Sequence, residues 1–474
     1  MSPYILILPA VLYLFCTRTL FWLAIWQQKE YRLDRFIAFL KDNPQSLTAS
    51  LIVIAFSKST LNRPALTPKA LLTALSTFVL SLFLLLLSPL PLYLSLPILY
   101  LLLPLVIIFS GLPLFIITQL AAIHYQNQAK NLIKRHQPLI IGITGSYGKT
   151  TTKILLSQLL SQQTSVWHSP KSYNTPLSLP RAVATGYTGQ KIVVLEFAAY
   201  KQGEIARLTK LFPPRLAILT GIAPQHLAIF GNTQNIIKAK SELPASLPNS
   251  ASFIFNDRNQ LASELAQTFP NLKLIKASSS DLSKPSLDDQ GHLSFTLAGQ
   301  RINTKLLGTH YFTNLHAAIT AAQTFGLGDK QIKAALESFK PGSEFIGLST
   351  THSGHQLLND GKTSNPDGFE AAVDLAAHLK ATQKIIITPG IIDLGTSSQQ
   401  IHFDLAKKAG AIFDRFIHTG PTQTQIIRHL LGIKYHQVTS VDQLKAAITN
   451  IKPHSLILIE GRIPDTYYQL LKNL

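Results

Sequence analysis

The sequence predicts an α/β protein in which a P-loop domain precedes a Rossmann-like C-terminal domain, with an α-helical membrane region of about three spans before both. Three observations predict this fold. Residues 70–129 contain no Lys, Arg, Asp or Glu. After His136, apolar β-strand-like runs alternate with helical patterns, as in parallel α/β sheets. Between the first strand and the first helix lies a glycine-rich turn that ends in Gly-Lys-Thr.

The composition is apolar and basic. Of the 474 residues, 46% are hydrophobic and 14% charged, and the mean hydropathy is +0.20, which is high for a soluble enzyme. The net charge of +19 fits lysines and arginines beside anionic lipid, or an anionic substrate, at least as well as nucleic acid. We therefore expect a membrane-lipid partner and no nucleic acid. The single cysteine, Cys16, excludes an intrachain disulfide and a multi-cysteine zinc site.

The first predicted span is 4–26. It lacks a basic start and a small-residue cleavage site, so an anchor fits better than a removed signal peptide. Arg18 is expected near the inner interface, because a charge at mid-depth must snorkel or face a partner. Residues 27–42 predict a basic amphipathic helix on the membrane surface, or one packed against the soluble part. The apolar run 51–56 is too short to span.

The uncharged stretch predicts two further spans, 70–88 and 92–122, separated by Pro-Leu-Pro at 89–91. Pro97, Pro104 and Pro113 predict that the last span is kinked or partly re-entrant. Basic residues in 27–69 and 130–135 place those segments inside by the positive-inside rule. The expected location is therefore the cytoplasmic membrane, multi-pass, with everything after residue 130 in the cytoplasm; a buried globular helical core is the alternative.

Residues 139–153, LIIGITGSYGKTTTK, combine a buried strand, a turn and a helix start. Gly145 and Gly148 let the backbone point successive N–H groups at one ligand. The helix N-terminus and Lys149 add positive charge, and the Thr150 hydroxyl can ligate Mg²⁺. These parts suit a nucleoside triphosphate, although the spacing T-G-x-x-G-K-T differs from G-x-x-x-x-G-K-[ST]. A glycine-rich turn without a nucleotide is the alternative.

Two sets of strands follow, consistent with two consecutive α/β units with parallel sheets. The predicted strands are 191–196, 216–220, 252–255 and 272–275, then 356–358, 384–388, 415–418 and 455–460, with helices such as 369–379 and 443–448 in the second set. Phe-Lys-Pro-Gly at 339–342 stops a helix. The predicted domains are therefore 1–136, 137–341 and 342–474.

Two polar residues follow predicted strands at the edge where ligands of doubly wound folds bind. Glu196 ends an apolar strand and could hold Mg²⁺, or cap the next helix. His226 follows another strand and is either a ligand or structural. Residues 236–242 form a helix with Lys238 and Lys240, which composition alone assigns to a solvated face.

Taken together, the runs ITGSYGKTTTK, LEF, TGIAPQHL, KAKSE, FND and GTHYFTN, in this order, resemble the Mur ligases across residues 138–474. GEIARL, KAKSEL and TPGIIDLG resemble most the member that adds D-alanyl-D-alanine to a muramoyl tripeptide. The family's usual UDP-sugar domain is replaced by membrane spans.

The resemblance implies a role for each matching residue. ATP phosphates and Mg²⁺ would be bound by Gly145, Ser146, Gly148, Lys149, Thr150 and Thr151. Glu196, His226 and a carbamylated Lys240 would join Thr150 in holding magnesium, and Lys149, Lys240, His226 and Lys362 would be catalytic. Asn256, Asp257 and Asn314, with His310 beside it, would contact adenine, and Asp360 the ribose; Lys362 would reach the γ-phosphate.

The implied activity is ATP-dependent amide ligation through an acyl phosphate, acting on a UDP- or lipid-linked muramoyl peptide and an amino acid or dipeptide. Four positions depart from the expected pattern: Gly221 replaces Asn, Ser343-Glu344 replace an arginine, Lys362 replaces the tyrosine of the D-alanyl-D-alanine-adding member, and Glu460-Gly461-Arg462 replace Lys-Gly. At Lys362 the sequence is more similar to the D-glutamate-adding member of the family. These departures bear on which amino acid is added more than on the ATP chemistry. The alternatives are a Mur-like ligase that makes a polyglutamate-type or cyanophycin-like polymer, and a non-catalytic nucleotide-binding membrane scaffold.

Overall fold

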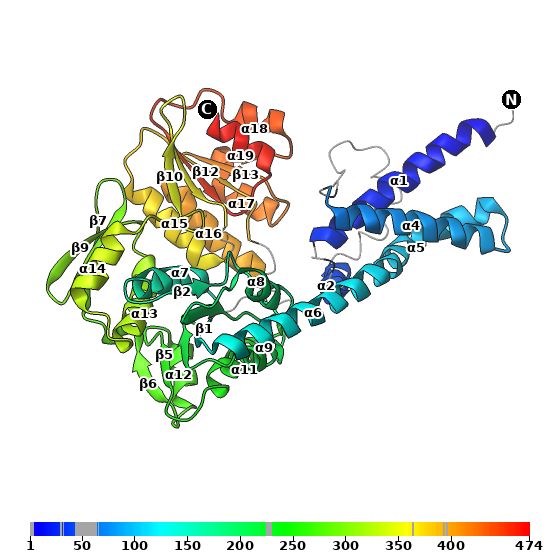
Figure 1. The fold of residues 1–474 in the computed structure, drawn as a ribbon. Helices are drawn as coiled ribbons and strands as arrows, with labels where there is room; N and C mark the ends of the chain where they lie inside the picture. The colour runs from blue at the N-terminus through cyan, green and yellow to red at the C-terminus, as the bar shows by residue number, and fades with distance from the viewer. Residues whose placement is uncertain are drawn as a thin grey trace. The chain divides into compact units, whose positions relative to one another are not determined.

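The computed structural model of the protein describes residues 4–28, 31, 33–42, 64, 66–223, 230–362, 365–391, 394 and 397–474. The chain forms two compact units, Met1–His124 and Tyr125–Leu474. The first unit is built from helices, and the second carries all the described sheets (Figure 1).

The described helices of the first unit pack around an aromatic and aliphatic cluster. Trp22 and Trp26 meet Phe36, Leu103 and Ile107 in this core. Arg18 is also buried, with its guanidinium 4.9 Å from the Trp22 ring and 5.4 Å from the Tyr100 ring. It therefore faces aromatic partners. The helices are α1 (Tyr4–Gln28), α2 (Leu33–Asp42), α4 (Pro68–Leu87), α5 (Leu92–Ser110) and the first part of α6 (Leu112–His136).

The α4 helix turns its small polar residues inward and its large apolar residues outward. Thr73, Thr77 and Ser81 are buried, and the Thr77 and Ser110 hydroxyl oxygens lie 2.7 Å apart between α4 and α5. The exposed residues of α4 are Leu71, Leu72, Leu75, Phe78, Val79, Leu82, Phe83, Leu84, Leu86 and Leu87. Close packing through small polar residues, with leucine outside, is typical of helices in lipid.

Two helical stretches of the described residues are long and apolar enough to cross a membrane, Pro68–Leu87 and Leu92–His136. They overlap the predicted spans 70–88 and 92–122, and the second continues beyond residue 122 to His136. The prediction of three spans is not borne out, because 4–26, although helical, is not among the two. The helix predicted at 27–42 is α2, which begins only at Leu33, and the run 51–56 lies outside the described residues.

The second unit begins with a parallel sheet of strand order β2-β3-β1-β4-β5-β6. Its runs are apolar on both faces because helices cover both. One face packs on α7, α13 and α14, the other on α8, α9, α11, α12 and residues 125–136 of α6. The elements are β1 (Leu139–Thr144), α7 (Lys149–Leu160), β2 (Val166–His168), α8 (Ser178–Gly186), β3 (Ile192–Glu196), α9 (Glu204–Leu211), β4 (Leu216–Leu219), α11 (Thr233–Ala245), β5 (Ser252–Phe255), α12 (Gln260–Gln267) and β6 (Lys273–Lys276).

A three-stranded antiparallel sheet, β7-β8-β9, follows and packs its inner residues into the same core as α7. Two helices complete this part of the chain before the second sheet begins. The elements are η3 (Ala277–Ser279), β7 (Leu282–Leu287), β8 (His292–Leu297), β9 (Gln300–Leu307), α13 (Tyr311–Thr324) and α14 (Asp329–Ser338).

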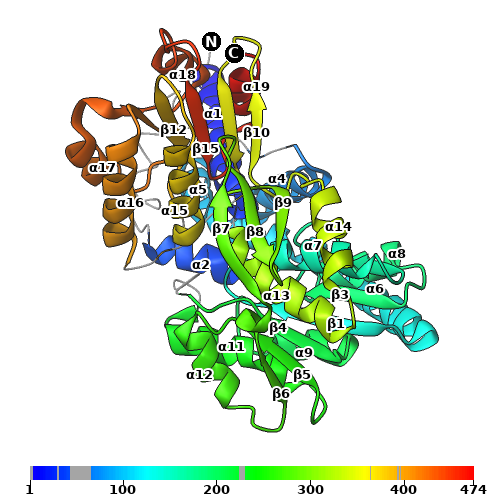
Figure 2. The same cartoon turned by 90° about the vertical axis from the view of Figure 1, so that its left-hand side faces the viewer.

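The second sheet has the order β10-β11-β15-β12-β13-β14 and is parallel except at β10. Figure 2 shows α15 and α16 side by side against it, and α18 and α19 cover its other face. The elements are β10 (Gly347–Thr350), β11 (Gln356–Asp360), α15 (Pro366–His378), β12 (Lys384–Thr388), α16 (Ser398–Ile412), β13 (Arg415–His418), α17 (Thr424–Leu431), η5 (Gly432–Lys434), β14 (Tyr435–Gln437), α18 (Val441–Ala447), β15 (Leu456–Glu460) and α19 (Asp465–Lys472).

All eight strands predicted after residue 190 are present, each within two residues of its expected bounds. The prediction of two parallel α/β units is correct for the two large sheets. It missed the antiparallel sheet β7-β8-β9, the antiparallel edge strand β10 and the short edge strands β2 and β14.

We expect the core between the first sheet and α7 to contribute strongly to the free energy of unfolding of the second unit. Leu156 of α7 is fully buried there, so Leu156→Ala should lower the free energy of unfolding by about 2–5 kcal/mol. Chemical unfolding of the purified protein, followed by circular dichroism, measures this. The control is Leu274→Ala, on edge strand β6 with 37% exposure, which should change it by less than about 1 kcal/mol. Equal effects of the two changes would contradict this description of the core.

Candidate functional site

The turn between β1 and α7 joins a buried strand to a helix start, as the sequence predicts. Gly145, Ser146 and Gly148 lie in the turn, and Lys149, Thr150 and Thr151 form the first turn of α7. Gly148 has a φ of +72°, and a Cβ there would stand 2.2 Å from the Asn314 amide nitrogen. A larger residue at 148 would therefore be strained and would push α13 away.

Asn314 of α13 clamps this turn. Its buried amide donates to the Gly148 carbonyl at 3.1 Å and to Thr152 Oγ1 at 3.2 Å. The structure places the Asn314 side chain, to which the family resemblance assigns a contact with adenine, against the turn. Its contact with the backbone stabilises the turn's conformation.

The Lys149 side chain folds back over its own turn. Its ammonium donates to the Gly145 carbonyl at 2.9 Å and the Ser146 carbonyl at 3.2 Å. Burial lowers the pKa of Lys149 below its ordinary value. Ser146 Oγ, for its part, exchanges 3.0 Å hydrogen bonds with the backbone of Ala223, which ties the turn to the segment after β4.

Glu196, at the end of β3, is a buried carboxylate that is 1% exposed. Thr150 Oγ1 donates to its Oε2 at 2.8 Å, and the Lys153 ammonium lies 3.3 Å from the same oxygen. The Asn174 amide donates to Oε1 at 2.8 Å. The carboxylate thus joins the first two turns of α7 to the loop after β2.

Lys240, on α11, is 5% exposed and belongs to the same charge cluster. Burial, assisted by the Lys149 ammonium, lowers the pKa of Lys240 to about 7, against the opposing carboxylates of Glu196 and Glu242. The structure therefore brings Lys149, Glu196 and Lys240 within electrostatic range. It does not place Lys240 on the solvated face that composition suggests.

The donors at this turn fit Mg²⁺. Thr150 Oγ1 and Glu196 Oε2 are oxygen donors that share one hydrogen bond, and Mg²⁺ in phosphate sites takes one or two protein oxygens beside phosphates and water. Among the described residues, no group of three or more His, Cys, Asp or Glu side chains could hold a metal by itself. His226, the other predicted magnesium ligand, lies outside the described residues.

The residues predicted to contact adenine are engaged within the protein. The Asn256 amide donates to the Thr220 carbonyl at 2.9 Å, and Asp257 Oδ1 accepts from Ser278 N at 2.9 Å. Burial raises the pKa of Asp257, but the Ser278 hydrogen bonds outweigh it and leave the pKa below its ordinary value. Burial lowers the pKa of His310 to about 4, so this ring is neutral at pH 7.

In the C-terminal domain, Asp360 ends β11 and lies opposite Glu460 of the adjacent strand β15. Burial, with the Asp360 charge, raises the pKa of Glu460 well above its ordinary value, while Thr388 donates to Glu460 Oε2 at 3.0 Å. Lys362, two residues after Asp360, donates to Ser343 Oγ at 3.0 Å and lies 3.4 Å from Glu344 Oε1. Three of the family departures therefore meet near the end of β11.

The remaining departure, Gly221, has a steric reason. A Cβ at Gly221 would stand 2.4 Å from the Tyr147 hydroxyl, which accepts a hydrogen bond from the Asn259 amide at 3.3 Å. The tyrosine of the turn thus fills the space beside residue 221, where the family usually has an asparagine.

Sequence reasoning missed Lys153 and Asn174. Lys153 follows Lys149 by four residues, which puts both on one face of α7, so this spacing was a usable signal. Asn174 reaches Glu196 only through the folding of the loop after β2, for which the sequence has no periodic signal.

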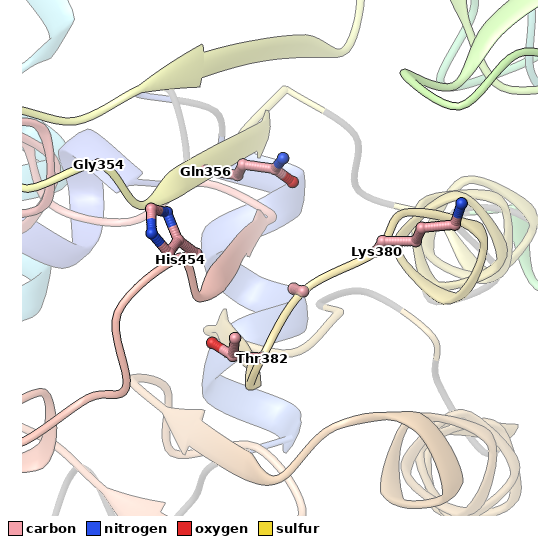
Figure 3. Close-up of a pocket in the computed structure, with 6 residues that line it drawn as sticks. Gly354, Gln356, Lys380, Thr382 and His454 are labelled. Carbon is pink, nitrogen blue, oxygen red and sulfur yellow. The ribbon is translucent and has the colours of Figure 1, made fainter.

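A surface pocket lies at the amino ends of β11, β12 and β15. Figure 3 shows Gln356, Lys380, Thr382 and His454 around it; Gly354 and Ala381 complete its lining. Because these strands are parallel, the pocket is at the opposite sheet edge from Asp360 and Glu460. It contains none of the predicted site residues.

Comparison with known proteins places this geometry in a family. Residues 143–322 match the Mur ligase middle domain, and residues 347–463 match the Mur ligase, glutamate ligase domain. Two similar proteins are named UDP-N-acetylmuramoyl-tripeptide--D-alanyl-D-alanine ligase. The one from Mycobacterium tuberculosis is 29% identical over 248 residues, 50% of this chain and 48% of that protein. The one from Bacillus subtilis is 27% identical over 364 residues, 74% of this chain and 78% of that protein.

A solved structure of a MurF ligase has a similar fold. The structure of a MurF ligase from Thermotoga maritima in complex with ADP superposes with a TM-score of 0.63 at 22% identity, covering 74% of this chain and 83% of that one. The chain spans about half the length of its mycobacterial relatives. The two family domains match this chain one after the other. The chain therefore belongs to the Mur ligase family, of which it carries the middle domain and the glutamate ligase domain.

Proposed function

We propose that this chain is an ATP-dependent ligase of peptidoglycan precursor synthesis that adds D-alanyl-D-alanine, or a related amino acid, to a muramoyl peptide. One observation carries the proposal: at the glycine-rich turn after β1, the buried Glu196 carboxylate accepts a hydrogen bond from Thr150 at 2.8 Å, and the Lys149 ammonium donates to the Gly145 carbonyl at 2.9 Å. The names of the relatives support the same reaction.

The reaction has two steps. An oxygen of the acceptor carboxylate attacks the γ-phosphorus of ATP, the bond from that phosphorus to the β–γ bridging oxygen breaks, and ADP leaves. The nitrogen of the incoming amine then attacks the acyl carbon, inorganic phosphate leaves, and the nitrogen loses a proton to give the amide. In both steps the protein mainly positions reactants and balances charge.

The phosphates would lie against Gly145, Ser146, Gly148, Lys149, Thr150 and Thr151. The Lys149 ammonium would exchange its contacts with the Gly145 and Ser146 carbonyls for phosphate oxygens. Asp360 would meet the ribose and Lys362 the γ-phosphate. Asn256, Asp257 and Asn314 would contact adenine, and their hydrogen bonds within the protein would hold them in position.

Thr150 and Glu196 would hold Mg²⁺, which when bound supplies positive charge to the phosphates. His226 and a carbamylated Lys240 would add further ligands. Carbamylation needs a neutral amine, whose nitrogen attacks CO₂ and releases one proton, leaving a carbamate anion. A pKa of about 7 makes a large neutral fraction of Lys240 available at physiological pH.

We further propose that this enzyme is a multi-pass protein of the cytoplasmic membrane, with the ligase domains facing the cytoplasm. Support comes from two candidate spans, from the leucine-rich outer face of α4, and from Lys130, Lys134 and Arg135 near the C-terminal end of the second apolar stretch. A lipid-linked acceptor would suit this arrangement, and a UDP-linked acceptor is the alternative.

We expect Lys149→Ala to lower acceptor-dependent ATP hydrolysis roughly 100-fold or more, because it removes a preorganised cation from the phosphates. Phosphate release from the detergent-solubilised protein, with muramoyl-peptide acceptors and D-alanyl-D-alanine, measures this. Lys333→Ala, at a lysine of α14 whose side chain is 35% exposed, is the control and should leave the rate unchanged. Equal activity in Lys149→Ala and the wild type would remove the enzymatic proposal.

We expect ¹³C-bicarbonate to give a carbamate ¹³C signal in the wild type and none in Lys240→Arg. The signal should grow as the pH rises through about 7, because the neutral amine, present above its pKa, is the reactive form. Activity should rise with bicarbonate in parallel. Lys238→Arg, an exposed lysine on the same helix, is the matched control and should keep the signal. The same spectrum in Lys240→Arg would exclude carbamylation of this lysine.

Mass spectrometry of the products identifies the substrates. With ATP and D-alanyl-D-alanine, we expect the mass of a muramoyl-peptide acceptor to rise by that dipeptide less one water. A lipid-linked acceptor should react faster than its UDP-linked equivalent if the membrane region serves the reaction. Good use of the UDP-linked acceptor and none of the lipid-linked one would contradict that role, and reaction only with single amino acids would reassign the incoming amine.

A further inference from the structure

The segment that joins the middle and C-terminal domains carries a charge that the proposed chemistry has not used. The antiparallel pair β10–β11 aligns Gly347 with Asn359. Continued past the ends of both strands, this register sets Glu344 opposite Lys362. The contacts follow the register: the Lys362 ammonium lies 3.4 Å from Glu344 Oε1 and donates to Ser343 Oγ at 3.0 Å.

This segment is fixed to the helix that clamps the glycine-rich turn. Ile346 N donates to the Tyr311 hydroxyl at 2.9 Å, and the Phe345 ring packs 5.4 Å from the Tyr311 ring. Tyr311 begins α13, and one turn later Asn314 holds the Gly148 carbonyl. The segment that carries Glu344 and the glycine-rich turn are therefore both held by α13.

Glu344 also acts on the buried charges of the site. Burial lowers the pKa of Lys153 overall, while the carboxylates of Glu196 and Glu344 oppose that shift. The same carboxylate of Glu344 opposes the burial that lowers the pKa of His168. Lys153 thus pairs with Glu196 at 3.3 Å in the core, and Glu344, which lies 3.4 Å from Lys362, is a second carboxylate that favours the charged form of Lys153.

Glu344 stands where the family usually has an arginine, and Lys362 stands where the D-alanyl-D-alanine-adding member has a tyrosine. In this chain, Lys362 therefore supplies the positive charge near residues 343–344, and it is paired with the Glu344 carboxylate. The pair is reachable by solvent, because its side chains are 56% exposed at Lys362 and 26% at Glu344. A polyphosphate entering the site would meet the Glu344 charge and compete with it for Lys362.

We propose that Glu344 is a positioning residue that holds Lys362 near the end of β11 and yields it to the polyphosphate of a nucleotide bound at the glycine-rich turn. This inference rests on the proposed function, since it needs a nucleotide at the turn. Glu344 both keeps the lysine in place and lowers the affinity for the nucleotide by charge repulsion. A carboxylate with a structural role alone would keep the lysine in place without lowering the affinity for the nucleotide.

The test compares nucleotides with different numbers of phosphates. Dissociation constants for a non-hydrolysable ATP analogue, ADP and AMP, each with Mg²⁺, are measured by calorimetry on the full-length protein in detergent. In Glu344→Gln, we expect the ATP analogue to bind about 3- to 10-fold more tightly at low salt, ADP less so, and AMP unchanged. The gain should disappear at high salt, because the pair is partly exposed.

Turnover gives a second measurement. Glu344→Gln should lower both KM for ATP and kcat, because the nucleotide binds better and the lysine is less well placed. Glu344→Asp keeps the charge and should restore wild-type values. Lys362→Gln should raise KM, and adding Glu344→Gln to it should change KM less than in the wild type. Glu337→Gln, which breaks a similarly exposed ion pair with Lys333, is the matched control and should have no effect.

The outcomes separate the two proposals. If the wild type binds no nucleotide better than Lys149→Ala does, the proposed function fails. If the wild type binds the analogue but Glu344→Gln leaves its affinity unchanged or weaker, or changes AMP equally, the role of Glu344 is overturned. A lower melting temperature in Glu344→Gln, with wild-type affinities, would likewise assign the carboxylate to structure alone.

Discussion

The buried contact between Glu196 and its three partners is the constraint on which the second unit's chemistry depends. A carboxylate with 1% exposure needs partners, because removing its charge from water costs several kcal/mol. Lys153 supplies the charge, and Thr150 and Asn174 supply hydrogen bonds. The same contacts fix α7 relative to β3 and to the loop after β2. The carboxylate thus serves the fold and keeps oxygen donors at the glycine-rich turn.

The helix α13 extends this arrangement to the C-terminal domain. It clamps the turn through Asn314 and receives the linker through Tyr311. Groups that are far apart in the chain are thereby held by one rigid element. The parallel pairing of β11 with β15 then sets Asp360 beside Glu460 at the carboxyl edge of the second sheet.

The sequence predicts the parts of this structure that depend on local pattern. Buried β-branched runs define the parallel strands, and Glu196 follows from the rule that ligands bind at the carboxyl ends of such strands. The antiparallel sheet was missed because Lys284 and Pro285 interrupt the apolar pattern of β7. Asn174 contacts Glu196, and Asn314 contacts Gly148, only through tertiary packing. The spacing of residues along the sequence does not predict such contacts. Lys240 shows the same limit, because composition places on the surface a lysine that α11 turns inward.

The position of the Lys149 ammonium on two carbonyls of its own turn has a kinetic consequence. A lysine free in solvent would lose about 2 kcal/mol of rotamer entropy on being immobilised by a ligand. Here the Gly145 and Ser146 oxygens already hold the side chain, so that freedom is lost before a ligand binds. Capture of a polyanion then needs only a short movement of one ammonium from carbonyl to phosphate, so the encounter rate, rather than side-chain reorganisation, would limit association.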